Sequence, residues 1–363
     1  MKDLVILCDW LPTESGALGQ YALQYARERA SGGEDVVLYG LTSGDSWVEE
    51  YSVGGDKLRI VRLHAPAYSR ASLRERAWWT LRTNVSLVFR ALPDIWNCRE
   101  LMFTGSPPFL LHVVAPVNVL LRRKLTYRIT DFFPEALIAE LGRTPWYLAA
   151  LRWLTIFWRR RVHKIEVLGE DQRRRLKEAG IPAGRIVLRR DTSPAELTSA
   201  TKPLARPQAL AGKRILLYSG NFGVAHDHET FLAGYRKHHR EGSGKVALWL
   251  NATGARADAL ERALNADGLP CHRTTPVPLE ELASLLVTPD AHLITLRDQF
   301  WGYVLPSKVY GCIDSGKPIL YVGPQDSDVH LLCRSKPTPG EYARVPTGDA
   351  DGVFEMLEKF AAN

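Results

Sequence analysis

The sequence predicts an α/β protein of two domains, each built on a parallel sheet with crossover helices. Short apolar runs alternate with segments of helical periodicity along the chain, which is typical of βαβ units. The length of 363 residues suits two domains that each bury a core. A polar, proline-containing stretch over residues 195–212 indicates a linker. We therefore expect a first domain over residues 1–196, a second over 197–348, and a C-terminal helix over 349–363.

The first domain is expected to contain strands whose carboxyl ends could bind a ligand. These strands are predicted at residues 4–9, 36–39, 58–63, 101–104, 125–130, 165–168 and 186–188. After the first of them comes PTESGALGQ, which contains Gly16 and Gly19. In open α/β sheets ligands bind at carboxyl ends of strands, and glycines let a backbone come close to them. Gly16 is therefore a candidate binding residue, although an ordinary strand-to-helix turn explains the loop equally well.

Two predicted helices combine tryptophans with basic residues. Residues 69–92 hold five arginines and the pair Trp78 and Trp79. The segment Trp146–Lys164 has three tryptophans, no acid, and a basic end formed by Arg159, Arg160, Arg161 and Lys164. Tryptophan favours the lipid headgroup zone, and basic residues favour an anionic leaflet. We expect the second segment to rest on an anionic membrane surface. The alternatives are a buried helix with a basic end and, less favoured because no nucleic-acid motif is present, a nucleic-acid contact.

The second domain opens with RILLYSGNFG, a strand that runs into a glycine turn, followed by a helix in AHDHETFLAGY. His226 and His228 could suggest a metal, but side chains two residues apart on a helix point to different faces. Helix capping is the better account, so we expect no metal site. Arg256 begins the next helix, where it could contact a phosphate or a base, or remain in solvent.

The stretch DQFWGYVLPSKVYGCIDSGKPILYVGP, residues 298–324, constrains function most. It predicts a loop, a helix entered through Pro306 and ended by Gly316, and then a buried strand. A helix N-terminus carries free N–H groups and a partial positive charge, to which Ser307 and Lys308 add a hydroxyl and an ammonium. We expect a phosphate or diphosphate to bind here. The alternative is an ordinary capped helix before a core strand.

The pattern PSK-xY-x5-GKPI, which includes Pro306, Ser307, Lys308 and Tyr310, resembles the donor-site helix of GT-B glycosyltransferases, above all family 4 (glycosyltransferases group 1). The resemblance implies two Rossmann-like domains whose parallel sheets face each other across a cleft, and a C-terminal helix that crosses back to the first domain. It also implies metal-independent transfer of a hexosyl group from a nucleotide sugar, with a UDP-sugar as the expected donor and no further cofactor.

Other segments add to this resemblance. Gly220, Asn221 and Gly223 are similar to the phosphate loop of the family's second domain, and the backbone of Val277 would read the nucleobase. The segment RITDFFPEAL resembles the D-[LF]-[WF]-P-E segment of one branch of the family. Asp131 would then point into the cleft and accept the proton of the acceptor hydroxyl. Its alternative role is to satisfy backbone groups ahead of a helix at Pro134.

Three points complete the site expected from the resemblance. Glu135 is a second choice for the base, and Lys308 would stabilise charge growing on the diphosphate, which is commonly the largest catalytic effect. The pattern usually carries two glutamates, but Tyr303 and Gly311 occupy those positions. Retention and inversion of the anomeric centre both stay open.

Composition narrows the setting of the protein. The net charge of +7 favours anionic partners such as nucleotide phosphates or an acidic membrane face. The five cysteines lie far apart without a C-x-x-C pair, which is typical of reduced core thiols. The N-terminus has too short an apolar run for a signal peptide. We expect a cytoplasmic protein, peripheral on the inner face of the cell membrane.

The leading hypothesis is a glycosyltransferase that acts on a lipid-linked or glycan acceptor in polysaccharide or glycoconjugate synthesis. One alternative is a non-catalytic subunit that binds a nucleotide sugar for a partner transferase, since the missing glutamates agree with lost chemistry. Another is a sugar-nucleotide epimerase of the same fold. Transfer, donor hydrolysis or epimerisation by the isolated chain distinguishes them.

Overall fold

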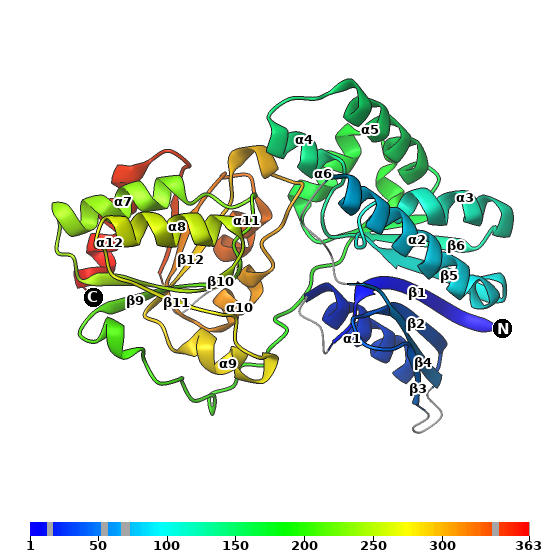
Figure 1. Ribbon diagram of the computed structural model, residues 1–363, viewed down its shortest axis with the longest axis horizontal. Coiled ribbons are helices and arrows are strands. Elements are labelled where there is room, and N and C mark those ends of the chain that lie inside the picture. The colour runs from blue at the N-terminus through cyan, green and yellow to red at the C-terminus, as the bar shows by residue number, and fades with distance from the viewer. Residues whose placement is uncertain (13–16, 52–56, 67–72, 336–340, 363) are drawn as a thin grey trace. The chain divides into compact units, whose positions relative to one another are not determined.

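The computed structural model describes residues 1–12, 17–51, 57–66, 73–335 and 341–362, and these form two compact units. Unit 1 is Met1–Arg190 and unit 2 is Asp191–Asn363 (Figure 1). The boundary predicted after residue 196 lies close to this division.

Unit 1 contains an eight-stranded sheet in the order β3-β4-β2-β1-β5-β6-β7-β8, in which β3 alone among the described strands runs antiparallel to its neighbour. The strands are β1 (Lys2–Trp10), β2 (Asp35–Thr42), β3 (Trp47–Tyr51), β4 (Lys57–His64), β5 (Cys98–Thr104), β6 (Lys124–Ile129), β7 (Lys164–Val167) and β8 (Ile186–Leu188). All the strands predicted for the first domain are present. The sequence did not predict β3, because WVEEY is an exposed edge strand with no apolar run.

Helices pack around this sheet and bury its central strands. They are α1 (Ala17–Ser31), α2 (Leu73–Trp96), α3 (Leu111–Leu121), α4 (Glu135–Leu141), α5 (Trp146–Arg159) and α6 (Glu170–Glu178), with a 3-10 turn at Ala183–Arg185. The middle of β1 is a run of five buried residues, as expected for a strand covered on both faces. α3 contacts both α2 and α5, so these three helices lie side by side.

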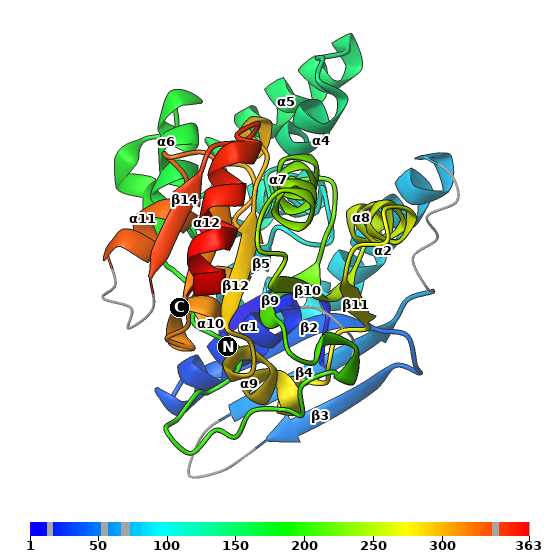
Figure 2. The same cartoon turned by 90° about the vertical axis from the view of Figure 1, so that its left-hand side faces the viewer.

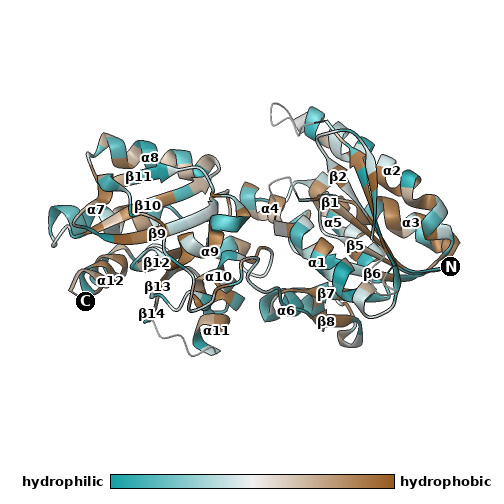
Figure 3. Ribbon diagram, turned by 90° about the horizontal axis from the view of Figure 1, so that it is seen from below, coloured by the Kyte–Doolittle hydropathy of each residue, from teal (hydrophilic) through white to brown (hydrophobic). Residues whose placement is uncertain are grey.

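Unit 2 contains a six-stranded parallel sheet in the order β11-β10-β9-β12-β13-β14. The strands are β9 (Arg214–Asn221), β10 (Val246–Thr253), β11 (Cys271–Thr274), β12 (Ala291–Thr295), β13 (Ile319–Val322) and β14 (Tyr342–Val345). The helices are α7 (Glu229–Arg240), α8 (Ala255–Ala266), α9 (Leu279–Val287), α10 (Lys308–Asp314), α11 (Asp328–Ser335) and α12 (Ala350–Ala362), with 3-10 turns at Gln208–Leu210 and Asp298–Phe300. Many helices show both hydrophilic and hydrophobic stretches (Figure 3), as amphipathic helices packed on a core do. The predicted α/β class with two Rossmann-like domains is confirmed.

The C-terminal helix packs on a helix of its own unit. α12 packs along α7 of its own unit (Figures 1 and 2), and its apolar residues Val353, Leu357 and Phe360 join the core of unit 2. His238 of α7 and Glu358 of α12 hold the two helices together through a 2.5 Å contact between Nδ1 and Oε1. With this apolar face buried against α7, the helix packs within unit 2, and its predicted return to the first domain stays a prediction.

Within the described parts of the chain, no helix has both the length and the apolar character that crossing a bilayer requires.

Candidate functional site

The carboxyl end of β9 brings Lys308 to a glycine turn. β9 ends in Gly220, whose φ of +105° suits glycine and strains other residues, and then Asn221. The Lys308 Cε lies 4.0 Å from the point that a Cβ on Gly220 would occupy. The lysine side chain therefore passes beside the end of β9.

The Lys308 ammonium is buried and has no anionic partner in the described chain. Its Nζ lies 3.2 Å from the centre of the Tyr218 ring and has no hydrogen-bond acceptor among the described residues. Burial lowers the pKa of Lys308 well below its ordinary value. The pKa of nearby His226 falls to about 3, first through burial and then through the charge of Lys308. A cation in such a position favours the binding of an anion.

Asn221, Gly223 and Arg256 lie together where β9 and its neighbour β10 end. A Cβ on Gly254 would lie only 2.7 Å from the Asn221 Oδ1, and one on Gly223 would lie 3.4 Å from the Asn221 Nδ2. The Arg256 amide donates to the Phe222 carbonyl at 3.1 Å. The Arg256 guanidinium lies 3.8 Å from an exposed Glu229 carboxylate, so it is already partly paired. Four of the predicted donor-site residues besides Lys308, namely Gly220, Asn221, Gly223 and Arg256, thus share one edge of the sheet.

The other donor-site residues predicted in unit 2 are buried or partly buried. α10 begins at Lys308, two residues after the predicted entry at Pro306, and Ser307 makes no side-chain capping hydrogen bond. Pro306 and Tyr310 are buried, and the Tyr310 side chain is 2% exposed. Val277 packs partly buried against the apolar cluster under α9. Donor contacts by these residues stay predictions, and Gly16 lies outside the described residues.

In unit 1, two carboxylates lie at the carboxyl ends of strands β1 and β6, on either side of β5. Asp131 lies two residues after the end of β6, and burial followed by the charge of Asp9 raises its pKa to about 6. Burial likewise raises the pKa of Asp9 to about 6, and a hydrogen bond from Ser106 opposes that rise. The Asp9 Oδ1 and the Thr130 hydroxyl are buried without a partner among the described residues. This edge can accept hydroxyl groups and can hold a proton near neutral pH.

Asp9 was not predicted as a site residue. The sequence nevertheless contained a signal for Asp9. Asp9 ends the first predicted strand and Asp131 follows a later one, and the carboxyl ends of parallel strands meet at the same edge of a sheet. Glu135, the second choice for the base, has a different role: its carboxylate accepts from the Arg159 guanidinium at 2.5 and 3.2 Å. The same guanidinium donates to the Phe133 carbonyl at 3.1 Å, so Arg159 fixes the segment after Asp131.

These contacts correct the predicted basic end of Trp146–Lys164. Arg159 is 1% exposed and therefore cannot reach a lipid phosphate. Lys164 starts β7 and pairs with Glu166 at 3.1 Å. Arg160 donates to the Ala179 carbonyl and Arg161 to the Phe157 carbonyl, and both donor–acceptor pairs are exposed.

Aromatic and aliphatic side chains are nevertheless exposed on the three adjacent helices and the end of α4. Trp146 is 83% exposed and Trp153 is 68% exposed on α5. The others are Trp78, Leu81, Phe89, Trp96, Val119, Leu120, Leu141 and Tyr147. We call this set the apolar helix surface. The sequence indicated only part of it, since the contribution of α3 was not expected.

A comparison with curated proteins finds sequence similarity to a probable glycosyltransferase. No protein-family model matches the chain. The chain is 26% identical over 246 residues to the probable glycosyltransferase WbjE of Pseudomonas aeruginosa, a match that covers 64% of this chain and 60% of the relative. The chain thus matches less than two thirds of that relative's length.

Solved structures of similar fold cover nearly the whole chain. Alr3699/HepE of Anabaena, in complex with UDP and glucose, has a TM-score of 0.65 at 10% identity and covers 99% of this chain and 89% of its own. An α,α-trehalose-phosphate synthase (UDP-forming) of Burkholderia vietnamiensis has a TM-score of 0.65 at 11% identity and covers 100% and 90%. At such identities the likeness concerns the fold, and that fold is GT-B.

Proposed function

We propose that this chain is a glycosyltransferase that moves a sugar from a nucleotide-sugar donor, expected to be a UDP-sugar, to a hydroxyl group of an acceptor. The observation that carries the proposal is the buried ammonium of Lys308, which has no hydrogen-bond acceptor among the described residues and lies beside the glycine turn at the end of β9. The GT-B fold and the similarity to a probable glycosyltransferase support it.

In this proposal unit 2 holds the donor. The diphosphate accepts hydrogen bonds from Lys308 and from amides near Asn221 and Gly223. As the bond between the sugar's anomeric carbon and the β-phosphate oxygen breaks, the electron pair stays with that oxygen. A fixed ammonium in a site of low dielectric stabilises this growing charge, because it needs no reorganisation at the moment of reaction.

Unit 1 supplies the base. The acceptor oxygen bonds to the anomeric carbon as its proton passes to the Asp131 carboxylate. A carboxylate whose pKa is about 6 is ionised at neutral pH yet is a better base than an exposed aspartate. The anomeric configuration of the product, measured by NMR, distinguishes inversion from retention.

The acceptor in this proposal is a lipid-linked or glycan molecule at the cytoplasmic face of an anionic membrane, in polysaccharide or glycoconjugate synthesis. The apolar helix surface supports this setting, because its tryptophans suit the headgroup zone. Exposed arginines on the same helices, including Arg82, Arg90 and Arg152, match an anionic leaflet in charge.

Lys308→Ala tests the donor site. We expect turnover, measured as UDP release from a UDP-sugar, to fall at least about tenfold while the fold stays intact, because a charge-assisted hydrogen bond to the leaving group is lost. Lys317→Ala, which removes a partly exposed lysine just after α10, should keep wild-type turnover. Full activity of Lys308→Ala would remove the basis of the proposal.

One observation favours the second candidate, a non-catalytic subunit that binds a nucleotide sugar. At Gly311, where the family pattern has its second glutamate, a Cβ would lie 2.8 Å from the Leu286 Cδ1. A glutamate has no room there unless Leu286 moves, so this part of the site is built without it. Saturable UDP binding by the chain without transfer or donor hydrolysis would select this candidate.

A further inference from the structure

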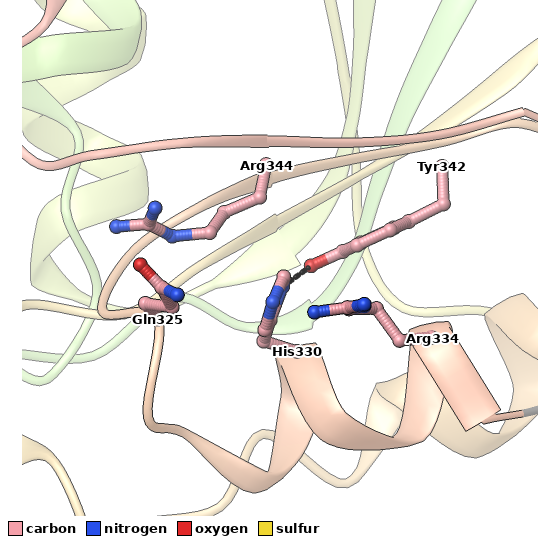
Figure 4. A pocket seen from close by; sticks show the side chains of 5 residues that line it. All are labelled: Gln325, His330, Arg334, Tyr342 and Arg344. Atoms are coloured by element: carbon pink, nitrogen blue, oxygen red, sulfur yellow. Dashed lines mark hydrogen bonds between the residues drawn. The ribbon is translucent and has the colours of Figure 1, made fainter.

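A basic cavity lies in unit 2 away from the donor residues. It has a volume of about 410 Å³ and is lined by Gln325, His330, Arg334, Tyr342 and Arg344 (Figure 4). These residues come from the turn after β13, from α11 and from the edge strand β14. In the sheet, β12 and β13 separate β14 from β9, where the donor turn lies. Three strand spacings amount to roughly 14 Å, so the cavity is a separate place.

Three of the five polar side chains that line the cavity are oriented by hydrogen bonds. The Arg344 Nε donates to the Gly323 carbonyl at 3.0 Å, which orients the guanidinium and leaves its terminal nitrogens for another acceptor. The His330 Nδ1 and the Tyr342 hydroxyl are 2.7 Å apart (Figure 4). Arg334 follows His330 by four residues on α11, so both side chains lie on the same face of that helix.

The charge of the cavity is unbalanced. Neither Arg334 nor Arg344 makes an ion pair with a described carboxylate. Burial lowers the pKa of His330, and the charges of Arg344 and Arg334 lower it further, while Asp326 acts in the opposite direction with a smaller effect. The charges of both arginines therefore act on His330 and favour its neutral form.

Other arginines of the same unit, in contrast to Arg334 and Arg344, pair with a carboxylate. A second cavity, of about 320 Å³, is lined by Arg206, Arg214 and Asp290 among others. There Asp290 lies 2.8 Å from Arg206 and 3.7 Å from Arg214, so both of these arginines have a carboxylate partner within the chain.

We propose that the cavity between α11 and β14 binds a phosphorylated small molecule of the sugar phosphate class. Arg334 and Arg344 hold the phosphate, since guanidinium groups present paired N–H donors that match phosphate oxygens. Gln325, His330 and Tyr342 supply neutral donors and acceptors for hydroxyl groups. The volume exceeds that needed for inorganic phosphate and suits a small ligand. This inference does not depend on the proposed glycosyltransferase activity.

Calorimetric titration of the full chain in chloride buffer tests the proposal, with inorganic phosphate and glucose 6-phosphate as probes. We expect saturable binding of both, with glucose 6-phosphate bound at least threefold more tightly. The double variant Arg334→Ala/Arg344→Ala should bind both inorganic phosphate and glucose 6-phosphate about tenfold or more weakly, because charge-assisted hydrogen bonds are lost. Arg236→Ala/Arg240→Ala is the matched control, since it removes two arginines of this unit that both contact Asp267. It should keep wild-type affinity.

Two further variants make the result decisive. Lys308→Ala should leave glucose 6-phosphate binding unchanged, which separates the cavity from the donor site. Arg334→Gln alters one exposed side chain and should weaken binding in the same direction even if the double variant folds poorly. Equal affinities of wild type and both cavity variants would overturn the proposal, and so would the absence of saturable binding of both probes. If glucose 6-phosphate binds no more tightly than inorganic phosphate does, the assignment to the sugar phosphate class is wrong.

Discussion

The ammonium of Lys308 lies 3.2 Å from the centre of the Tyr218 ring and is buried without a hydrogen-bond acceptor in the described chain. An aromatic face attracts a desolvated cation by about 2 kcal/mol. Removing an ammonium from water without a paired anion costs several kcal/mol. The ring offsets only part of that cost, so the free protein holds Lys308 at a net loss of stability that a bound diphosphate would reverse.

Replacing Lys308 with methionine should therefore stabilise the free protein and impair the donor site. Methionine has a similar length and no charge to desolvate, so we expect the free energy of unfolding to rise by about 1–2 kcal/mol. UDP binding, measured by calorimetry, should weaken at least about tenfold. Lys317→Met is the matched control and should change neither quantity. A destabilised Lys308→Met variant would mean that the ammonium has a favourable partner in the free protein.

The pair Asp9 and Asp131 predicts how activity depends on pH. If Asp131 must be ionised to accept a proton, kcat/KM should fall as the pH drops below about 6. Asp9→Asn keeps the size of the side chain and removes the charge that helps raise the pKa of Asp131. The acid limb of the profile should then move to lower pH by up to about one unit. An unchanged profile would mean that Asp9 does not influence the group that titrates.

The same pKa values predict a pH-dependent effect on stability. Asp131 has a folded pKa of about 6 against an ordinary value of 3.8. Because the folded pKa is raised, ionisation favours the unfolded chain, and the cost develops as the pH rises from about 4 through 6. Asp131→Asn should therefore raise the melting temperature at pH 8 and leave it nearly unchanged at pH 4. A gain of equal size at both pH values would contradict this account.

The sequence predicted those features that depend on the residues of a single strand, helix or turn. Runs of apolar residues such as the middle of β1 mark buried strands, and the glycine turn at Gly220 follows from the local pattern. The placement of charged residues depends on long-range packing. Arg159 was expected at a membrane surface, but Glu135, 24 positions earlier, accepts from its guanidinium.

The same limit applies to Asp9, whose coupling to Asp131 arises only when β1 and β6 are placed on either side of β5. The apolar face of α12 likewise could not reveal that α7 covers it. The cavity with Arg334 and Arg344 also combines residues of separate elements. No pattern local to one of these segments could have disclosed them.

The ion pair between Arg159 and Glu135 should be a major determinant of the stability of unit 1. Arg159→Met leaves a buried carboxylate without its partner, which typically costs 3–5 kcal/mol, an order-of-magnitude expectation for urea unfolding. Arg159→Met/Glu135→Leu removes both charges and should regain about half of that loss or more. Arg161→Met, an exposed change two residues away, should stay within about 0.5 kcal/mol of wild type. Equal stability of Arg159→Met and Arg161→Met would show that the pair is not needed.

The apolar helix surface predicts membrane binding that depends on Trp146 and Trp153. These side chains are 83% and 68% exposed, and burial of each in the headgroup zone contributes about 1–2 kcal/mol. Trp146→Ser/Trp153→Ser should therefore weaken binding to phosphatidylglycerol vesicles, measured by co-sedimentation, by at least about tenfold. The matched control is Trp47→Ser, since Trp47 is 52% exposed on β3 at the far edge of the sheet. Binding of the control should equal that of wild type, and binding to neutral phosphatidylcholine vesicles should be weaker because the arginines then lack anionic partners. If the double variant sediments with anionic vesicles as well as wild type does, α5 does not contact the lipid.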